Sequence, residues 1–357
     1  MMKTLRRTRV DARLIGCALL TGGIWSTALA TDSVHWRSVQ PASAVPASRD
    51  GHLMVYDSKT RSVVLFGGKG SRSRCFNDLW AYSPSTHRWT QLRPSGSFPP
   101  GRFGNGLAYD THRKELLVFG GVLADSTGPA DDFWAYNDAA NAWSRLEVTG
   151  PRPAARVYPS MAYDPTHHAV VLFAGWMGGT GTFGDTWIYD VSAKRWTKLA
   201  AARHPHARWG ASMVYDPDTQ TILLFGGLFG SYDGSHRLND LWSYSPSTHA
   251  WHELRPSSST PPSRGYAAMD YNSATHQLVL FGGFAGSRGL LADTWTYDPA
   301  RNAWGQVMGT GGNPPGRDFS ALAYDKKARQ LVLFGGLTGS TGNVNGTLMN
   351  DTWTAGS

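Results

Sequence analysis

The feature that most constrains the fold is an apolar run that ends in two glycines and returns at a nearly constant interval. It first occurs at residues 63–68 as Val-Val-Leu-Phe-Gly-Gly. The second glycine of each copy is Gly68, Gly121, Gly175, Gly227, Gly283 and Gly336, which gives steps of 53, 54, 52, 56 and 53 residues. A fixed period of this length indicates a repeat architecture, in which each copy is one supersecondary unit.

Each repeat contains four short segments with the composition of β-strands. In the first repeat, residues 53–57 end in Tyr-Asp, the apolar run follows, and two further segments carry Trp80 and Trp89. The apolar run reads as a strand buried on both faces. A polar connection at 58–61 has the length of a hairpin turn. The pattern therefore predicts four antiparallel strands per repeat.

Six such copies resemble the kelch repeat, whose period is near 50 residues. The resemblance covers nearly all of the chain after residue 34, with two small departures, Ala174 for a glycine and Ala355 for a tyrosine. It implies an all-β, six-bladed kelch β-propeller. The propeller resembles the central domain of galactose oxidase. The copper site of that family, a cysteine cross-linked to a tyrosine with two histidines, is not expected here, because no matching Tyr/His set accompanies Cys75. The expected blades are 48–93, 101–148, 155–200, 207–255, 263–308, and 316–354 with 35–39.

The sixth repeat lacks its fourth strand, because the sequence stops shortly after Trp353. The missing pattern occurs near the other end, where residues 35–39 (His-Trp-Arg-Ser-Val) match residues 88–92. The N-terminal segment is therefore predicted to complete the last blade and to close the ring, which removes open sheet edges.

Residues 1–30 have the composition of a secretory signal peptide: a basic start, an apolar run and the small-residue site Ala-Leu-Ala at 28–30. We expect cleavage after Ala30, a secreted or periplasmic protein, and no membrane-spanning segment. The segment carries five Lys/Arg and one Asp, so four of the eight net positive charges leave with it. The remaining mild charge does not favour nucleic-acid binding.

Sixfold repetition separates structural residues from functional candidates, because a binding site seldom needs six copies of one residue. An arginine opens every repeat and an aspartate precedes every third-strand tryptophan. We interpret these as a structural ring of charge-assisted hydrogen bonds. The frame arginines are Arg49, Arg102, Arg156, Arg208, Arg264 and Arg317, and the frame aspartates are Asp78, Asp132, Asp185, Asp240, Asp293 and Asp351.

Several aromatic residues break the repeat, and they occur in two regions that meet at one mouth of a kelch propeller. One group follows the frame arginines, and the other lies in loops after Gly-Gly. Exposed aromatic clusters are typical of binding sites, whereas packing inside the channel is the structural alternative for each residue. The ligand-binding candidates of both groups are Phe103, Tyr158, Trp176, Trp209, Tyr232, Tyr266 and Phe319, with His204 and His206 in a nearby loop.

The polar irregularities are fewer. Asp50 and Asp318 each follow a frame arginine, and His52 lies two residues after Asp50, so these three are the weak catalytic candidates. His204-x-His206 lacks an accompanying carboxylate or cysteine, and we expect solvated histidines there and no metal. No cofactor is expected.

These patterns favour an exported protein that binds a carbohydrate or glycan at the aromatic mouth. Two alternatives from other classes stay open, because fold alone determines little about function. One is an isomerase- or epimerase-like enzyme that uses the acidic and histidine residues on a sugar. The other is a protein–protein interaction scaffold.

Overall fold

A computed structural model describes residues 34–124, 128–179, 181–200, 202–230, 236–308, 312–339 and 346–356. All of them belong to one compact unit, residues 31–357. Within these ranges the chain is all-β, with two single-turn 3₁₀ helices at Ser71–Ser73 and Gly286–Arg288. The described residues contain no helix with the length and apolar character that crossing a bilayer requires.

The strands form antiparallel four-stranded sheets, one from each repeat, as the sequence predicted. The first sheet consists of β2 (Leu53–Asp57), β3 (Ser62–Phe66), β4 (Leu79–Ser83) and β5 (Arg88–Leu92). The second consists of β7 (Gly106–Asp110), β8 (Glu115–Phe119), β10 (Phe133–Asn137) and β11 (Ala142–Arg145). The third consists of β12 (Ser160–Asp164), β13 (Ala169–Trp176), β14 (Thr182–Asp190) and β15 (Arg195–Leu199).

The other three sheets have the same order of strands along the chain, except that the last one ends with the N-terminal strand. The fourth sheet consists of β16 (Ser212–Asp216), β17 (Thr221–Phe225), β20 (Leu241–Ser245) and β21 (Ala250–Leu254). The fifth consists of β22 (Ala268–Asn272), β23 (Gln277–Phe281), β24 (Thr294–Asp298) and β25 (Ala303–Val307). The last consists of β27 (Ala321–Asp325), β28 (Gln330–Phe334), β31 (Thr352–Gly356) and β1 (His35–Val39).

Short strands also pair outside the four-stranded sheets. Two of them begin at frame arginines, β6 (Arg102–Phe103) and β26 (Arg317–Asp318). The others lie in loops after Gly-Gly pairs: β9 (Val122–Leu123), β18 (Leu228–Phe229), β19 (His236–Arg237), β29 (Leu337–Thr338) and β30 (Thr347–Leu348). The pairings of β6 with β9 and of β26 with β29 bring residues beside the frame arginines next to the Gly-Gly loops.

The N-terminal strand β1 pairs with β31, with Trp36 opposite Ala355. The Trp36 side chain is only 5% exposed, and its Nε1 donates a hydrogen bond of 2.9 Å to Thr294 Oγ1 in the neighbouring sheet. Its ring centroid lies 5.5 Å from that of Phe281. The segment that the sequence assigned to the incomplete repeat therefore does lie in that sheet.

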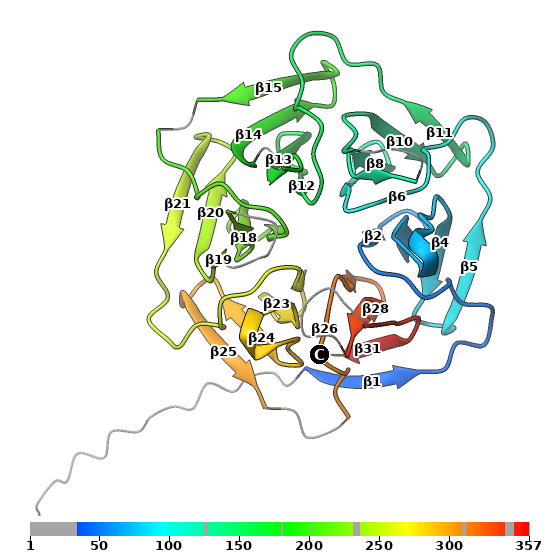
Figure 1. The fold of residues 1–357 in the computed structure, drawn as a ribbon, viewed down its shortest axis with the longest axis vertical. Coiled ribbons are helices and arrows are strands. Elements are labelled where there is room, and N and C mark those ends of the chain that lie inside the picture. The colour runs from blue at the N-terminus through cyan, green and yellow to red at the C-terminus, as the bar shows by residue number, and fades with distance from the viewer. Residues whose placement is uncertain are drawn as a thin grey trace, which may run out of the picture. The chain divides into compact units, whose positions relative to one another are not determined.

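The first strands of the sheets lie nearest to a common centre, and the fourth strands lie outside (Figure 1). Contacts between first strands run from β2 to β7, β12, β16, β22 and β27, and β27 also contacts β2. The space that these six strands surround is called the central channel below.

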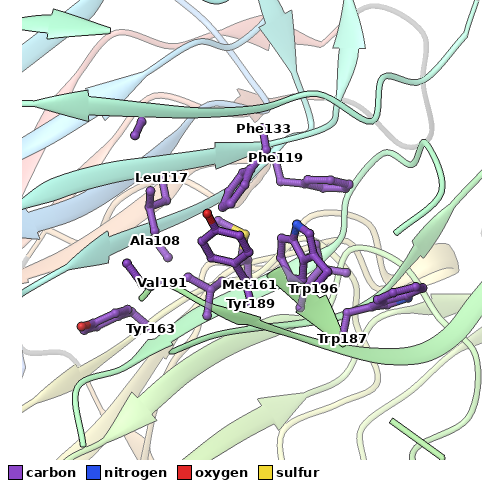
Figure 2. Packing of buried hydrophobic residues seen from close by; sticks show 13 residues of the cluster. Ala108, Leu117, Phe119, Phe133, Met161, Tyr163, Trp187, Tyr189, Val191 and Trp196 are labelled. Atoms are coloured by element: carbon purple, nitrogen blue, oxygen red, sulfur yellow. The ribbon is translucent and has the colours of Figure 1, made fainter. Parts of the chain in front are cut away.

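The apolar core lies between neighbouring sheets rather than inside any one of them. Figure 2 shows one cluster, to which Phe119 and Phe133 contribute from one sheet and Tyr189 and Trp196 from the next. The rings of Phe133 and Tyr189 meet edge to face with their centroids 4.8 Å apart. A four-stranded sheet has two apolar faces, and each is buried only when a neighbouring sheet is present.

Candidate functional site

The predicted ring of arginines and aspartates is present, and it is structural. Arg49 is fully buried and binds Asp78 through two hydrogen bonds of 2.6 and 2.8 Å, and its Nη1 also donates to the carbonyl of Gly67. Trp80 Nε1 donates to the same carboxylate. Burial acts to raise the pKa of Asp78, but the hydrogen bonds and charge of Arg49 hold that pKa below its usual value.

The other five repeats have the same arrangement. Every frame arginine is at most 1% exposed and is joined to its aspartate by 2.6–2.7 Å between the closest atoms. These side chains fix each loop to its own sheet. Their hydrogen-bonding groups are used within the fold, so they offer little to a substrate.

The second residue after each frame arginine has the same unusual backbone conformation in all six repeats. Three repeats have glycine there, with φ of 61–63°, and three have an aromatic residue with φ of 52–56°. The residues are Gly51, Gly104, Tyr158, Gly210, Tyr266 and Phe319. A positive φ is ordinary for glycine and strained for a bulky residue.

Backbone hydrogen bonds join these six residues in a circuit around the central channel. Each N–H donates to the carbonyl of the equivalent residue in the previous repeat, and the N–H of Gly51 donates to Phe319 at 3.2 Å. The other distances are 2.6–3.2 Å. The shared positive φ orients each peptide for both of its bonds.

The three aromatic residues of this circuit, Tyr158, Tyr266 and Phe319, pack against one another, and we call them the plug. Tyr266 and Phe319 stack with centroids 3.8 Å apart, and Tyr158 lies 5.2 and 5.4 Å from them. The glycines leave room for these rings: a Cβ on Gly210 would lie 2.5 Å from Tyr266. The plug thus fills one end of the channel, here called the loop end.

The two irregular tryptophans are also brought together. Trp176 stacks on Trp209 with centroids 5.6 Å apart. Trp209 is 2% exposed and contacts Tyr158 and Tyr266, so it belongs to the packing around the plug. Because neighbouring rings cover it, its burial favours the alternative of packing in the channel for this residue. Trp176 is half-buried, and Met177 beside it is 41% exposed.

The remaining aromatic and histidine candidates lie around this group. Phe103 is half-buried near Tyr158, with the Lys69 ammonium 5.3 Å from its ring centre. His204 is exposed, and exposed His206 contacts the ring of Phe229. Tyr232 lies outside the described residues. Among the side chains that the structure describes, no group of three or more His, Cys, Asp or Glu is arranged to hold a metal ion.

The acidic candidates are close enough to influence each other, but they are poorly accessible. Burial raises the pKa of Asp50 to about 6, and burial together with the charge of Asp50 raises the pKa of Asp318 to about 7. Asp318 is 6% exposed and His52 only 1%. Burial, and then the charge of Arg49, lower the pKa of His52 to about 3, so this histidine is neutral at ordinary pH.

One functional candidate was missed. Asp270 lines the central channel at a position where the other repeats have an apolar residue. Those residues are Val55, Ala108, Ala162, Val214 and Ala323. The same comparison between repeats that singled out the aromatic residues would have found this aspartate.

Comparison with known proteins gives consistent matches. Residues 24–227 and 169–355 match the family described as the KLHDC2/KLHL20/DRC7 Kelch-repeats domain. Kelch domain-containing protein 2 of Bos taurus is 26% identical over 329 residues, which cover 82% of this chain and 77% of that protein. Kelch domain-containing protein 3 of the same species is 24% identical over 86% of this chain and 68% of that protein.

Similar repeats also occur within much longer proteins. The flagellar outer-arm dynein alpha chain of Chlamydomonas reinhardtii is 26% identical over 85% of this chain, but the match spans only 7% of the dynein chain. The similarity therefore concerns the repeat domain and not the whole of such a protein.

Proposed function

Because the chain belongs to the kelch-repeat family, whose domains generally serve as protein-interaction scaffolds, we propose that residues 31–357 form one six-bladed propeller that binds a polypeptide partner at its loop end. Two parts of this proposal need separate support: the closed ring and the binding surface.

The closed ring is supported by contacts that join the first and last repeats. The hydrogen-bond circuit includes the bond from Gly51 to Phe319. Trp89 Nε1 in the first sheet donates to Thr352 Oγ1 in the last at 3.0 Å. Strand β1 supplies the fourth strand of that last sheet. With these contacts, both edges of the array are covered.

The observation that carries the binding proposal is the loop tip of the third repeat. Here half-buried Trp176, held from behind by Trp209, stands next to exposed Met177. A rigidly supported tryptophan beside an exposed methionine is typical of the apolar anchors of protein interfaces. The frame arginines and aspartates are already satisfied within the fold, which favours binding over catalysis.

Carbohydrate recognition is a second candidate, because the Trp176 ring can stack on the apolar face of a sugar. Fewer observations support it, because other rings cover Trp209 and the plug rings pack on one another, so their faces are not available to a sugar. The sugar-modifying enzyme has less support again: His52 and Asp318 are at most 6% exposed, so a substrate has little access to the proposed acid and base.

We also propose export to a secreted or periplasmic location, on the composition of residues 1–30, which lie outside the described residues. Intact-mass measurement of the protein recovered outside the cytoplasm tests this. A mature N-terminus at Thr31 is expected, and retention of residues 1–30 would refute it.

Site-specific photo-crosslinking tests the binding proposal. A photoreactive phenylalanine analogue at Met177 should give a crosslink to a polypeptide, and Trp176→Ala should abolish it. The matched control carries the analogue at Ser85, an exposed turn residue. Equal crosslinking from both positions would contradict the proposal. Saturable binding on a glycan array that depends on Trp176 would favour carbohydrate instead.

A further inference from the structure

The central channel contains a cavity of about 310 Å³ that extends away from the plug. The first strands of all six sheets line it, whereas the three plug rings line a separate, smaller cavity of about 90 Å³. The larger cavity reaches the residues that begin the hairpin turns, such as Ser58 and Lys326. We call this the turn end of the channel.

The walls of the larger cavity are mainly apolar and aromatic. Four methionines and six tyrosines line it, one tyrosine from each repeat. They are Met54, Met161, Met213, Met269, Tyr56, Tyr109, Tyr163, Tyr215, Tyr271 and Tyr324. A cavity of this size, lined largely by apolar and aromatic side chains, has the character of a small-molecule site.

The charged side chains among the described lining residues are one carboxylate, Asp270, and one ammonium, that of Lys326. Asp270 accepts hydrogen bonds from its neighbour Tyr271 N at 2.8 Å and from Tyr324 N, in the next sheet, at 2.6 Å. Each bond uses one carboxylate oxygen, and each oxygen retains a second acceptor site. The residue is partly buried and belongs to the cavity lining.

We propose that this cavity binds a small organic cation, an ammonium or guanidinium group on an apolar stem, with its charged head at Asp270 and its stem among the methionines and tyrosines. A carboxylate in an apolar enclosure attracts a cation more strongly than it would in water. Tyrosine rings add cation–π attraction, and the thioether side chains adapt to an aliphatic stem. This proposal is independent of the loop-end binding surface.

Ionisation of Asp270 gives the site a defined pH dependence. Burial raises the pKa of Asp270 to about 6, opposed by the backbone bonds of Tyr324 and Tyr271 and the charge of Lys326. Only the carboxylate form attracts a cation. Affinity should therefore be full above pH 7 and should fall as the pH decreases through about 6.

Isothermal titration calorimetry with hexylammonium tests the proposal, with 1-hexanol as the uncharged probe of equal stem length. Hexylammonium is expected to bind the parent protein at least tenfold more tightly than hexanol does. Asp270→Asn should remove this preference, because the amide is uncharged yet retains an oxygen that can accept one backbone bond. Asp190→Asn, at the exposed end of β14 and outside the cavity lining, is the matched control and should change nothing.

Two further measurements keep the test decisive if Asp270→Asn unfolds. Lys326→Gln leaves the carboxylate in place, removes a competing positive charge and should tighten hexylammonium binding about two- to threefold. In the parent protein, affinity should drop between pH 7 and pH 5. Equal binding of the two probes, or hexylammonium affinity that is unchanged by pH, would show that Asp270 only joins β22 to β27.

Discussion

The two ends of the central channel belong to the same six sheets but differ in what fills them. At the loop end, three aromatic rings from the third, fifth and sixth positions of the circuit pack together over a small cavity. At the turn end, six tyrosines surround a larger cavity that contains one carboxylate. The repeats share the same strand arrangement, so the difference between the ends comes from the side chains at a few positions, such as the three plug residues.

The filled end is maintained at an energetic cost. Tyr158, Tyr266 and Phe319 have positive φ, a conformation that costs about 1–3 kcal/mol for such residues. Their mutual packing and the space left by Gly104 and Gly210 offset this cost. The filled end therefore depends on a large ring in one repeat facing a glycine in its neighbour. Substituting the glycine tests this dependence.

The largest effect is expected from removing the strand on which both ends depend. Deletion of residues 31–40 should expose the edge of β31 and remove the buried Trp36 ring, and loss of a buried tryptophan alone costs about 3–5 kcal/mol. Urea unfolding measures the effect. Trp36→Phe is the control, since it retains strand β1 and an aromatic ring while it loses the indole bond to Thr294 and some buried volume. An unchanged midpoint for the deletion would refute ring closure.

The next effect separates the two stacked tryptophans of the loop end. Trp209→Ala should lower the free energy of unfolding by about 3–5 kcal/mol, because the side chain is 2% exposed. Trp176→Ala should lower the free energy of unfolding by clearly less, because Trp176 is only half-buried. Urea unfolding of the two variants compares them. Equal small losses would return Trp209 to the group of ligand-binding candidates.

A smaller effect is expected from crowding the plug without removing any of its rings. Gly210→Ala places a Cβ 2.5 Å from Tyr266 and should cost about 1–3 kcal/mol beyond the backbone strain. Gly96→Ala is matched, because φ is also positive there but no atom lies within 4 Å of the added Cβ. Thermal unfolding gives the difference between them. Equal midpoints would mean that the plug can shift freely.

The smallest effect is electrostatic and concerns the two aspartates beside the plug, Asp50 and Asp318. The folded protein raises the pKa of Asp318 from 3.8 to about 7, so it binds a proton more tightly than the unfolded chain. Stability contributed by protonated Asp318 is therefore lost as pH rises from about 4 through 7. Asp318→Asn should be more stable than the parent at pH 8, by roughly 1–3 kcal/mol, and the advantage should shrink towards pH 4. A constant difference at all pH values would exclude this titration.

Most of the fold could be predicted from the sequence because the repeat supplies each signal six times. The strands, the arginine–aspartate pairs and the position of Trp36 all follow from residues in register. The sequence left binding and channel packing open for Trp209, because its burial depends on Tyr158 and Tyr266 from neighbouring repeats covering it. The positive φ of the plug residues was not predicted either, although glycine at the equivalent position of the other three repeats was a signal for it.

The contrast between the two ends is tested most directly by NMR of protein labelled with ¹³C at the methionine methyl groups. Met213 and Met269 line the cavity at the turn end with Asp270, whereas Met177 and Met308 are 41% and 79% exposed and lie outside that lining. We expect titration with hexylammonium to shift the methyl signals of the cavity methionines and to leave Met177 and Met308 unchanged, and Asp270→Asn to abolish the shifts. Shifts confined to Met177 or Met308, or none at all, would contradict an accessible cation site at the turn end of the channel.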